Sequence, residues 1–116
     1  VEEDLFSPTV VKVVKSLENK ALYFSRSPIP NMKSLEENKW LQNGTYFKHI
    51  GMYGYRTEVL KAISSLEQTP LEKSESLEQL RWLENGFSIQ LAETEHESNS
   101  VDTPEDLDRL MEAQNL

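Results

Sequence analysis

The chain has 116 residues and a formal net charge of −8 at pH 7, with 12 Lys and Arg residues against 20 Asp and Glu. This length suits one domain, and the few scattered cations exclude the concentrated basic surface that binding to a nucleic-acid backbone requires. The sequence has no cysteine, which excludes disulfides, thiolate metal sites and a cysteine nucleophile. No apolar run approaches the ~20 residues that cross a bilayer, so we expect a cytoplasmic protein that binds neither nucleic acid nor membrane.

A β-hairpin is predicted near the start of the chain. The acidic, turn-like residues 1–9 lead into the β-branched run 10–14, which predicts a strand, and the apolar run 21–25 predicts a second one. A connection of about five residues, with a turn at Asn19, joins the two strands.

The following segment is expected to leave this sheet. Residues 26–30 contain two prolines, which have no backbone N–H for a sheet ladder and favour extended conformations in the residues before them. Residues 31–45 are polar and end near an Asn-Gly pair, which predicts a loop with one helical turn around 35–40.

Residues 47–56 are rich in aromatic residues and predict a strand with two different faces. One face carries His49, Gly51, Tyr53 and Tyr55, and the other carries Ile50, Met52 and Gly54. An imidazole and two phenols around a glycine suit a sugar-sized polar ligand. However, a strand histidine is more often a core residue, and buried phenols usually just find a hydrogen-bond partner. The glycines mark either a close approach or a bulge.

Helices are predicted in the second half of the chain. Apolar residues at helical spacing predict an amphipathic helix over 57–66. A Thr-Pro-Leu-Glu capping pattern starts another helix over 70–84, which is either continuous or broken near Ser74. The Asn-Gly pair at 85–86 is a typical helix end.

The last part of the chain predicts a strand, a loop and a final helix. Residues 87–92 alternate between apolar and polar, which predicts a strand, and the polar residues 93–100 predict a loop. Asp102 precedes a Thr-Pro helix start. Because strands and helices alternate after residue 45, the sequence predicts an α/β fold with an opening β-hairpin.

Several polar residues have both a functional and a structural interpretation. Asp102, at a strand-loop-helix junction, either helps to hold Mg²⁺ or supports a helix cap. Glu78 and Arg81 are spaced for an ordinary ion pair on a solvated helix face. Arg26 either receives an anionic group or is a surface cation. His96 has no second histidine at ligand spacing, so we do not expect a metal site there.

Four motifs occur in order along the chain: ALYFSR at 21–26 with Ile-Pro at 29–30, KHIGMYGYR at 48–56, PLEKSESLEQLR at 70–81, and VDTPEDL at 101–107. Together they closely resemble the C-terminal half of the 3-deoxy-manno-octulosonate cytidylyltransferases, also called CMP-Kdo synthetases. The resemblance covers nearly the whole chain and is weakest at 31–45 and 93–100.

This resemblance implies a fold, an activity and a set of site residues. Members of the family join 3-deoxy-manno-octulosonate (Kdo) to CMP, using CTP and Mg²⁺ and releasing pyrophosphate, for bacterial lipopolysaccharide. The implied fold is the C-terminal half of a nucleotide-diphospho-sugar transferase-like mixed-sheet domain that forms a homodimer. By motif, His49 and Tyr53 would line the Kdo pocket, Glu78 and Gln79 would bind its hydroxyls, and Asp102 would be one of two aspartates that hold Mg²⁺.

The sequence departs from the family at two points. Lys33 is the only candidate for a basic residue that the family places after the Ile-Pro, and a lysine lacks the forked geometry of arginine. The nucleotide-binding N-terminal part is absent, and the chain starts at Val1 rather than Met. We therefore expect residues 1–116 to be the Kdo-binding and dimerisation part of a longer chain, and to be inactive alone.

Two alternatives stay open at this point. The chain could be a non-catalytic dimerisation or interaction fragment, or it could belong to a CMP-transferase that acts on a related eight- or nine-carbon sugar acid.

Overall fold

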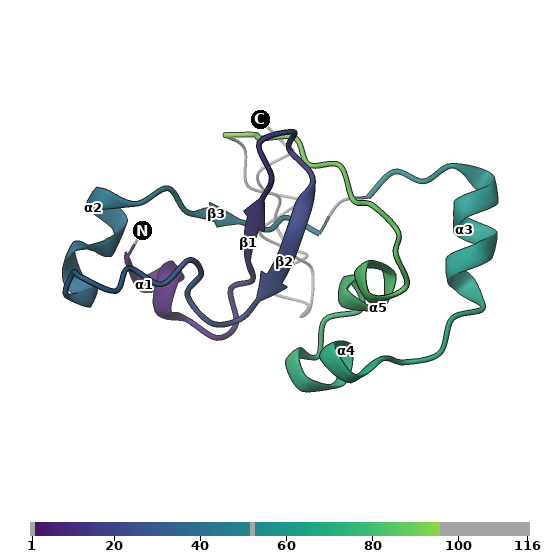
Figure 1. Cartoon of the computed structure of the whole chain (residues 1–116), viewed down its shortest axis with the longest axis horizontal. Coiled ribbons are helices and arrows are strands. Elements are labelled where there is room, and N and C mark those ends of the chain that lie inside the picture. The colour runs from purple at the N-terminus through teal and green to yellow at the C-terminus, as the bar shows by residue number, and fades with distance from the viewer. Residues whose placement is uncertain (1, 52, 96–116) are drawn as a thin grey trace, which may run out of the picture.

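The computed structural model describes residues 2–51 and 53–95 of the chain (Figure 1). The expected final helix, together with Asp102 and His96, lies outside these residues.

A three-stranded antiparallel sheet forms the centre of the described chain (Figure 1). Its strands are β1 (Lys12–Lys15), β2 (Ala21–Ser25) and β3 (Phe47–Lys48), in the spatial order β2-β1-β3. Val13 of β1 lies opposite Phe24 of β2. The predicted hairpin is therefore confirmed, with its first strand shifted by one to two residues.

The hairpin turn has the expected length and turn residue. Its connection runs from Ser16 to Lys20, and Asn19 has a positive φ of 64°. Asparagine tolerates this left-handed conformation better than most residues.

The prediction of a strand over 47–56 is wrong beyond its first residues. β3 ends at Lys48, and the last ladder-like bond is donated by the His49 N–H to the carbonyl of Val11 at 2.8 Å. Before β1 the chain turns, as the bond from the Val10 N–H to the Ser7 carbonyl at 3.1 Å indicates. Within residues 2–51 and 53–95, the segment that follows His49 consequently has no neighbouring strand with which to pair, whatever its own preference for extended structure.

Helical segments extend on both sides of the sheet (Figure 1). A 3₁₀ turn over Glu37–Lys39 continues into α2 (Trp40–Asn43), slightly later than the predicted helical turn. The short helix α1 (Glu2–Phe6) replaces the expected turn, and three acidic residues in its first turn favour a helix start. The helix α3 (Thr57–Ser64) confirms the prediction for 57–66.

The predicted helix over 70–84 is broken into α4 (Pro70–Glu75) and α5 (Gln79–Glu84). The break lies at Ser76, whose φ of 56° is left-handed, two residues after the predicted position. Gly86 follows α5 with a φ of 86°, as expected for a residue that ends a helix.

The strand predicted over 87–92 does not form. Among the described residues, this segment makes only an isolated bridge, between Lys20 and Gln90, because it runs beside the hairpin turn rather than beside a ladder. The Ala21 N–H donates to the Ile89 carbonyl at 2.8 Å, and the Leu91 N–H donates to the Asn19 carbonyl at 2.7 Å.

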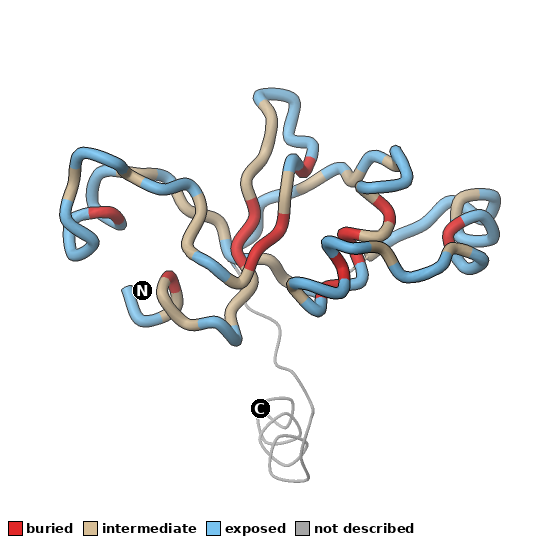
Figure 2. Tube along the Cα trace, turned by 60° about the horizontal axis from the view of Figure 1, so that its bottom comes forward, coloured by how far each residue is buried: buried red, intermediate tan, exposed pale blue. Residues whose placement is uncertain are grey.

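The main core lies between the hairpin and α5. Its buried members are Val13, Ala21, Phe24, Leu77 and Leu80. Outside this core the tube is mostly intermediate or exposed (Figure 2), and the radius of gyration is 16.2 Å, against about 13 Å for a compact chain of similar length. None of the helices in the described part of the chain is long and apolar enough to cross a membrane.

Candidate functional site

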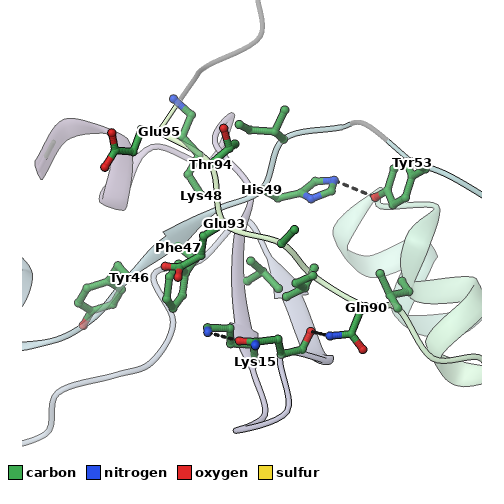
Figure 3. A pocket seen from close by; sticks show the side chains of 16 residues that line it. Lys15, Tyr46, Phe47, Lys48, His49, Tyr53, Gln90, Glu93, Thr94 and Glu95 are labelled. Carbon is green, nitrogen blue, oxygen red and sulfur yellow. Dashed lines mark hydrogen bonds between the residues drawn. The ribbon is translucent and has the colours of Figure 1, made fainter.

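The structure brings His49 and Tyr53 into direct contact. The Tyr53 hydroxyl and the His49 Nε2 atom are 2.8 Å apart and share a hydrogen bond (Figure 3). Both residues are half-buried, and they belong to the irregular segment that joins β3 to α3. The two side chains that the sequence placed on one face of a strand therefore lie together although the strand does not form.

Three aromatic side chains pack against this pair: Phe24 and Trp82 from other elements and Tyr55 from the same segment. The Phe24 ring of β2 meets the His49 ring edge-on at 5.0 Å, and the Trp82 ring of α5 meets the Tyr53 ring edge-on at 5.2 Å. Tyr55 stacks on Tyr53 at 6.1 Å and also contacts Trp82 at 5.8 Å. Edge-to-face and offset contacts of this kind are favourable for aromatic rings.

Sequence reasoning did not identify Trp82 as part of the site. Its only local signal is its position three residues after Gln79, on the same face of the helix. Its contact with Tyr53 depends on how α5 packs, and that packing could not be inferred from the spacing of residues.

The surroundings of the pair favour its uncharged form. Burial lowers the pKa of His49 below its ordinary value. Burial, followed by the neighbouring Tyr55 and the negative charge of Glu78, raises the pKa of Tyr53 above its ordinary value. A neutral imidazole and a protonated phenol are groups that both donate and accept hydrogen bonds, so the pair suits neutral hydroxyl groups of a ligand.

A hollow of about 770 Å³ lies beside the pair (Figure 3). Its lining comes from the hairpin, from residues 46–50 and 53, and from residues 89–95. His49 and Tyr53 both contribute to this lining, whereas Glu78 and Gln79 do not. The four residues named from the sequence therefore do not all face one cavity in the described part of the chain.

Glu78 and Gln79 lie at the start of α5, on the helical side of the aromatic cluster. Glu78 is exposed and close enough for its charge to raise the pKa of both Tyr53 and Tyr55. Gln79 is buried, at 7% exposure. Among residues 2–51 and 53–95, no side chain or backbone group hydrogen-bonds to the side chain of either residue, so neither side chain is tied to another part of the described chain.

The expected ion pair between Glu78 and Arg81 does not form. Arg81 instead donates from Nε and Nη2 to the two carboxylate oxygens of Glu72, at 2.8 and 2.6 Å. Glu72 also accepts from the Thr69 N–H at 3.3 Å, which is one half of the predicted capping box. This forked contact ties α4 to α5 and leaves the Glu78 carboxylate unpaired by Arg81.

Lys33 and the two glycines, Gly51 and Gly54, do not line the hollow or lie against another part of the described chain in a way that assigns them a role. Lys33 is exposed and does not line the hollow. A Cβ atom added at Gly51 or Gly54 would meet nothing within 4 Å, so neither glycine marks a close approach of another part of the described chain.

No metal centre can be assembled from the described residues alone. Within residues 2–51 and 53–95, no three His, Cys, Asp or Glu side chains gather in a group that could hold a metal ion. Asp102, the candidate from the sequence, lies outside this part of the chain. A role of Asp102 in holding Mg²⁺ therefore stays a prediction.

Comparison with known proteins identifies the class. The model of the cytidylyltransferase family matches residues 1–96, so the chain belongs to the cytidylyltransferase family.

Individual relatives of the chain have a more specific name than the family model. The chain is 50% identical over 110 residues to a 3-deoxy-manno-octulosonate cytidylyltransferase of Parabacteroides distasonis, a match that covers 95% of this chain and 44% of the relative. It is 48% identical over 118 residues to the enzyme of the same name from Geotalea daltonii, covering 94% of this chain and 45% of that protein. The chain thus spans less than half of the length of these relatives.

A solved structure confirms the expected fold class. The chain superposes with a TM-score of 0.83 and 38% identity on CMP:2-keto-3-deoxy-manno-octonic acid synthetase complexed with CTP. The match covers 100% of this chain and 46% of the solved one. The predicted resemblance is confirmed, and the fold corresponds to part of a larger nucleotide-sugar transferase-like domain.

Proposed function

We propose that this chain supplies the Kdo-binding part of a cytidylyltransferase that transfers CMP from CTP to Kdo and releases pyrophosphate, on the way to lipopolysaccharide. The observation that carries the proposal is the hydrogen-bonded pair of His49 and Tyr53 in a chain of the cytidylyltransferase family. The sugar acid would lie on the side of this pair that faces the start of α5, where the charge of Glu78 acts on Tyr53, rather than deep in the hollow, which Glu78 and Gln79 do not line. Residues 1–116 would be the sugar-binding and dimerisation part, and the nucleotide-binding part would lie in a further segment.

The proposed roles follow from the chemistry of the side chains. His49 and Tyr53, both neutral, would exchange hydrogen bonds with sugar hydroxyls, while the carboxylate of Glu78 would accept from others. The amide of Gln79 both donates and accepts, which would fix the orientation of the sugar ring. This part of the site acts by placement, because holding a hydroxyl in line with a phosphorus atom converts an encounter into an oriented attack.

The carboxylate of the sugar acid needs a different partner, because the pair of His49 and Tyr53 is neutral. Lys33 is the candidate from the sequence. Mg²⁺, when bound, would neutralise phosphate charge, and Asp102 is the proposed protein ligand. The homodimer and the cytoplasmic location follow from the resemblance and from the composition, and they remain proposals.

Pyrophosphate release tests the proposal. The product of the complete reading frame that contains this chain should release pyrophosphate from CTP only when Kdo is present. A panel of related eight- and nine-carbon sugar acids should give lower kcat/KM values than Kdo. A stronger response to another sugar acid would move the assignment to that substrate, and no binding of Kdo or CTP would favour a non-catalytic interaction fragment.

The chain of 116 residues gives the complementary experiment. On its own it should release no pyrophosphate from CTP and Kdo, because the proposal places the nucleotide site elsewhere. Turnover by this chain would contradict that division of labour.

A further inference from the structure

Arg26 directly follows β2, and its guanidinium donates to backbone carbonyls. Its Nε donates to the Glu75 carbonyl at 2.7 Å, its Nη2 to the Ser76 carbonyl at 3.2 Å, and its Nη1 to the Pro8 carbonyl at 3.1 Å. The sequence left open whether Arg26 receives an anion or is a plain surface cation. In the structure Arg26 is half-buried, and each of its three guanidinium nitrogens donates to a backbone carbonyl.

The side chain of Glu75 in turn accepts hydrogen bonds from β2 and from Arg26. One carboxylate oxygen accepts from the Arg26 backbone N–H at 3.0 Å, and the other accepts from the Tyr23 hydroxyl at 3.0 Å. Burial would raise the pKa of Glu75, but hydrogen bonds from Ser25, Arg26 and Tyr23 outweigh it and lower this pKa below its ordinary value. Glu75 is therefore a carboxylate held from several directions.

A buried lysine also binds the backbone around Arg26. Lys12 is only 2% exposed, and its Nζ donates to the carbonyls of Arg26, Val10 and Ser7 at 2.5, 2.6 and 2.8 Å. A buried ammonium group with three acceptors is well satisfied, so the backbone around Arg26 has little freedom to shift.

Two of the three carbonyls that Arg26 contacts, those of Glu75 and Ser76, lie at the break between α4 and α5. In an unbroken helix, the carbonyls of Glu75 and Ser76 would accept from the N–H groups four residues later. Arg26 occupies these carbonyls instead, and Ser76 adopts its left-handed φ of 56°. Gln79, which begins α5, follows three residues later.

The direction of α5 determines where Glu78 and Gln79, the side chains proposed to bind the sugar, point. A helix turns by about 100° per residue, so a small change at Ser76 would rotate Glu78 and Gln79 away from the side that faces Tyr53. Arg26 and Glu75 themselves do not line the hollow beside His49.

We infer that Arg26 and Glu75 are positioning residues, which hold the turn between α4 and α5 and thereby place Glu78 and Gln79 for binding of the sugar acid without touching it. This inference rests on the proposed function and adds two residues to it that the site geometry alone does not include.

The test uses Arg26→Lys, Glu75→Gln and the double variant in the product of the complete reading frame. Lysine keeps the charge but cannot reach two adjacent carbonyls with a planar fork. Each single variant should raise the KM for Kdo about tenfold and leave the KM for CTP within about twofold. The reason is that a displacement of Glu78 and Gln79 by about 1 Å weakens binding of the sugar acid but not of the nucleotide. The double variant should be no worse than either single one, as expected for two residues that act as a unit.

Glu58→Gln is the matched control. Glu58 is an exposed acid in the first turn of α3, and this variant should leave both KM values unchanged. Hydrogen exchange gives a readout that does not depend on turnover: the amides of residues 76–79 should exchange faster in Arg26→Lys and in Glu75→Gln than in wild type or in the control.

Three results would overturn the inference. A lower thermal midpoint with an unchanged ratio of the two KM values would mean a merely structural role. A raised KM for Kdo in Arg26→Lys but not in Glu75→Gln would mean that Arg26 binds the ligand directly. Unchanged exchange at residues 76–79 would mean that the pair does not hold the turn. By contrast, absence of Kdo-dependent pyrophosphate release by the wild type would overturn the proposed function, and the exchange data would then still decide whether the pair holds the turn.

Discussion

Replacing Tyr53 by Phe removes one hydroxyl and keeps the ring. The lost group shares a hydrogen bond with the His49 Nε2 atom at 2.8 Å, while the ring contacts with Trp82 and Tyr55 do not need the oxygen. Any change in this variant can therefore be assigned to the hydrogen bond and to whatever the hydroxyl offers a ligand.

The expected size follows from the surroundings of the bond. A hydrogen bond between neutral protein groups contributes about 0.5–1.5 kcal/mol net. The pair is half-buried, so we expect the free energy of unfolding to fall by about 1 kcal/mol. If the same hydroxyl binds a sugar hydroxyl, the KM for Kdo should rise about fivefold, since 1.4 kcal/mol corresponds to a factor of ten.

Steady-state kinetics with each substrate varied in turn provide the assay, and Tyr55→Phe provides the control. Tyr55 is 43% exposed and packs on the same rings, and among the residues that the structure describes none hydrogen-bonds to its hydroxyl. The control should therefore change stability by less than about 0.5 kcal/mol and leave both KM values unchanged. An equal rise of the KM for Kdo and the KM for CTP in Tyr53→Phe would refute the assignment of Tyr53 to the sugar-acid pocket.

Three further predictions concern stability and metal dependence. Burial lowers the pKa of His49 in the folded state, so neutral His49 should contribute its full stabilisation of the fold above the ordinary pKa of about 6.5, and this contribution should be lost as the pH falls through the folded-state pKa. In denaturant melts over this pH range, the free energies of unfolding of wild type and His49→Gln should converge at low pH. A difference between the two that stays constant with pH would contradict this prediction. Gly86→Ala should lower the free energy of unfolding by about 1–2 kcal/mol through its left-handed φ of 86° alone, whereas Gly54→Ala should cost less than about 0.5 kcal/mol in the same melts. In the product of the complete reading frame, Asp102→Asn should remove most Mg²⁺-dependent turnover with an unchanged thermal midpoint, and near-normal rates at all Mg²⁺ concentrations would exclude the metal role.

Local signals predicted the elements that depend on local chemistry. The β-branched and apolar runs around Asn19 specify the hairpin, and the capping pattern at residues 69–72 specifies the start of α4. Gly86 ends α5 because a left-handed φ suits glycine. In each case the decisive interaction lies within a few residues of the signal.

The wrong predictions share a different cause, because a strand needs a partner that its own residues do not encode. Residues 47–56 have the composition of a strand, but β1 offers a partner only as far as His49. Residues 87–92 alternate as a strand should, but the hairpin turn offers them a single bridge at Gln90.

The site shows the same division between local and distant information. Motif spacing pointed to His49 and Tyr53, and the structure brings these two together. Trp82, which supports Tyr53, and Glu75, which fastens the turn before Glu78, could not be found from the sequence. Their roles arise from the packing of α5 and of β2, more than 20 residues away from each contact in the chain.

A crystal structure of the complete reading-frame product with Kdo is the most direct test of the central claim. The account predicts the sugar acid within hydrogen-bond distance of the His49 and Tyr53 side chains, with Glu78 and Gln79 on the opposite side of the ligand. Kdo bound elsewhere, with the hydrogen bond between His49 and Tyr53 intact and its surroundings empty, would contradict the assignment of this chain as the sugar-acid part of the enzyme.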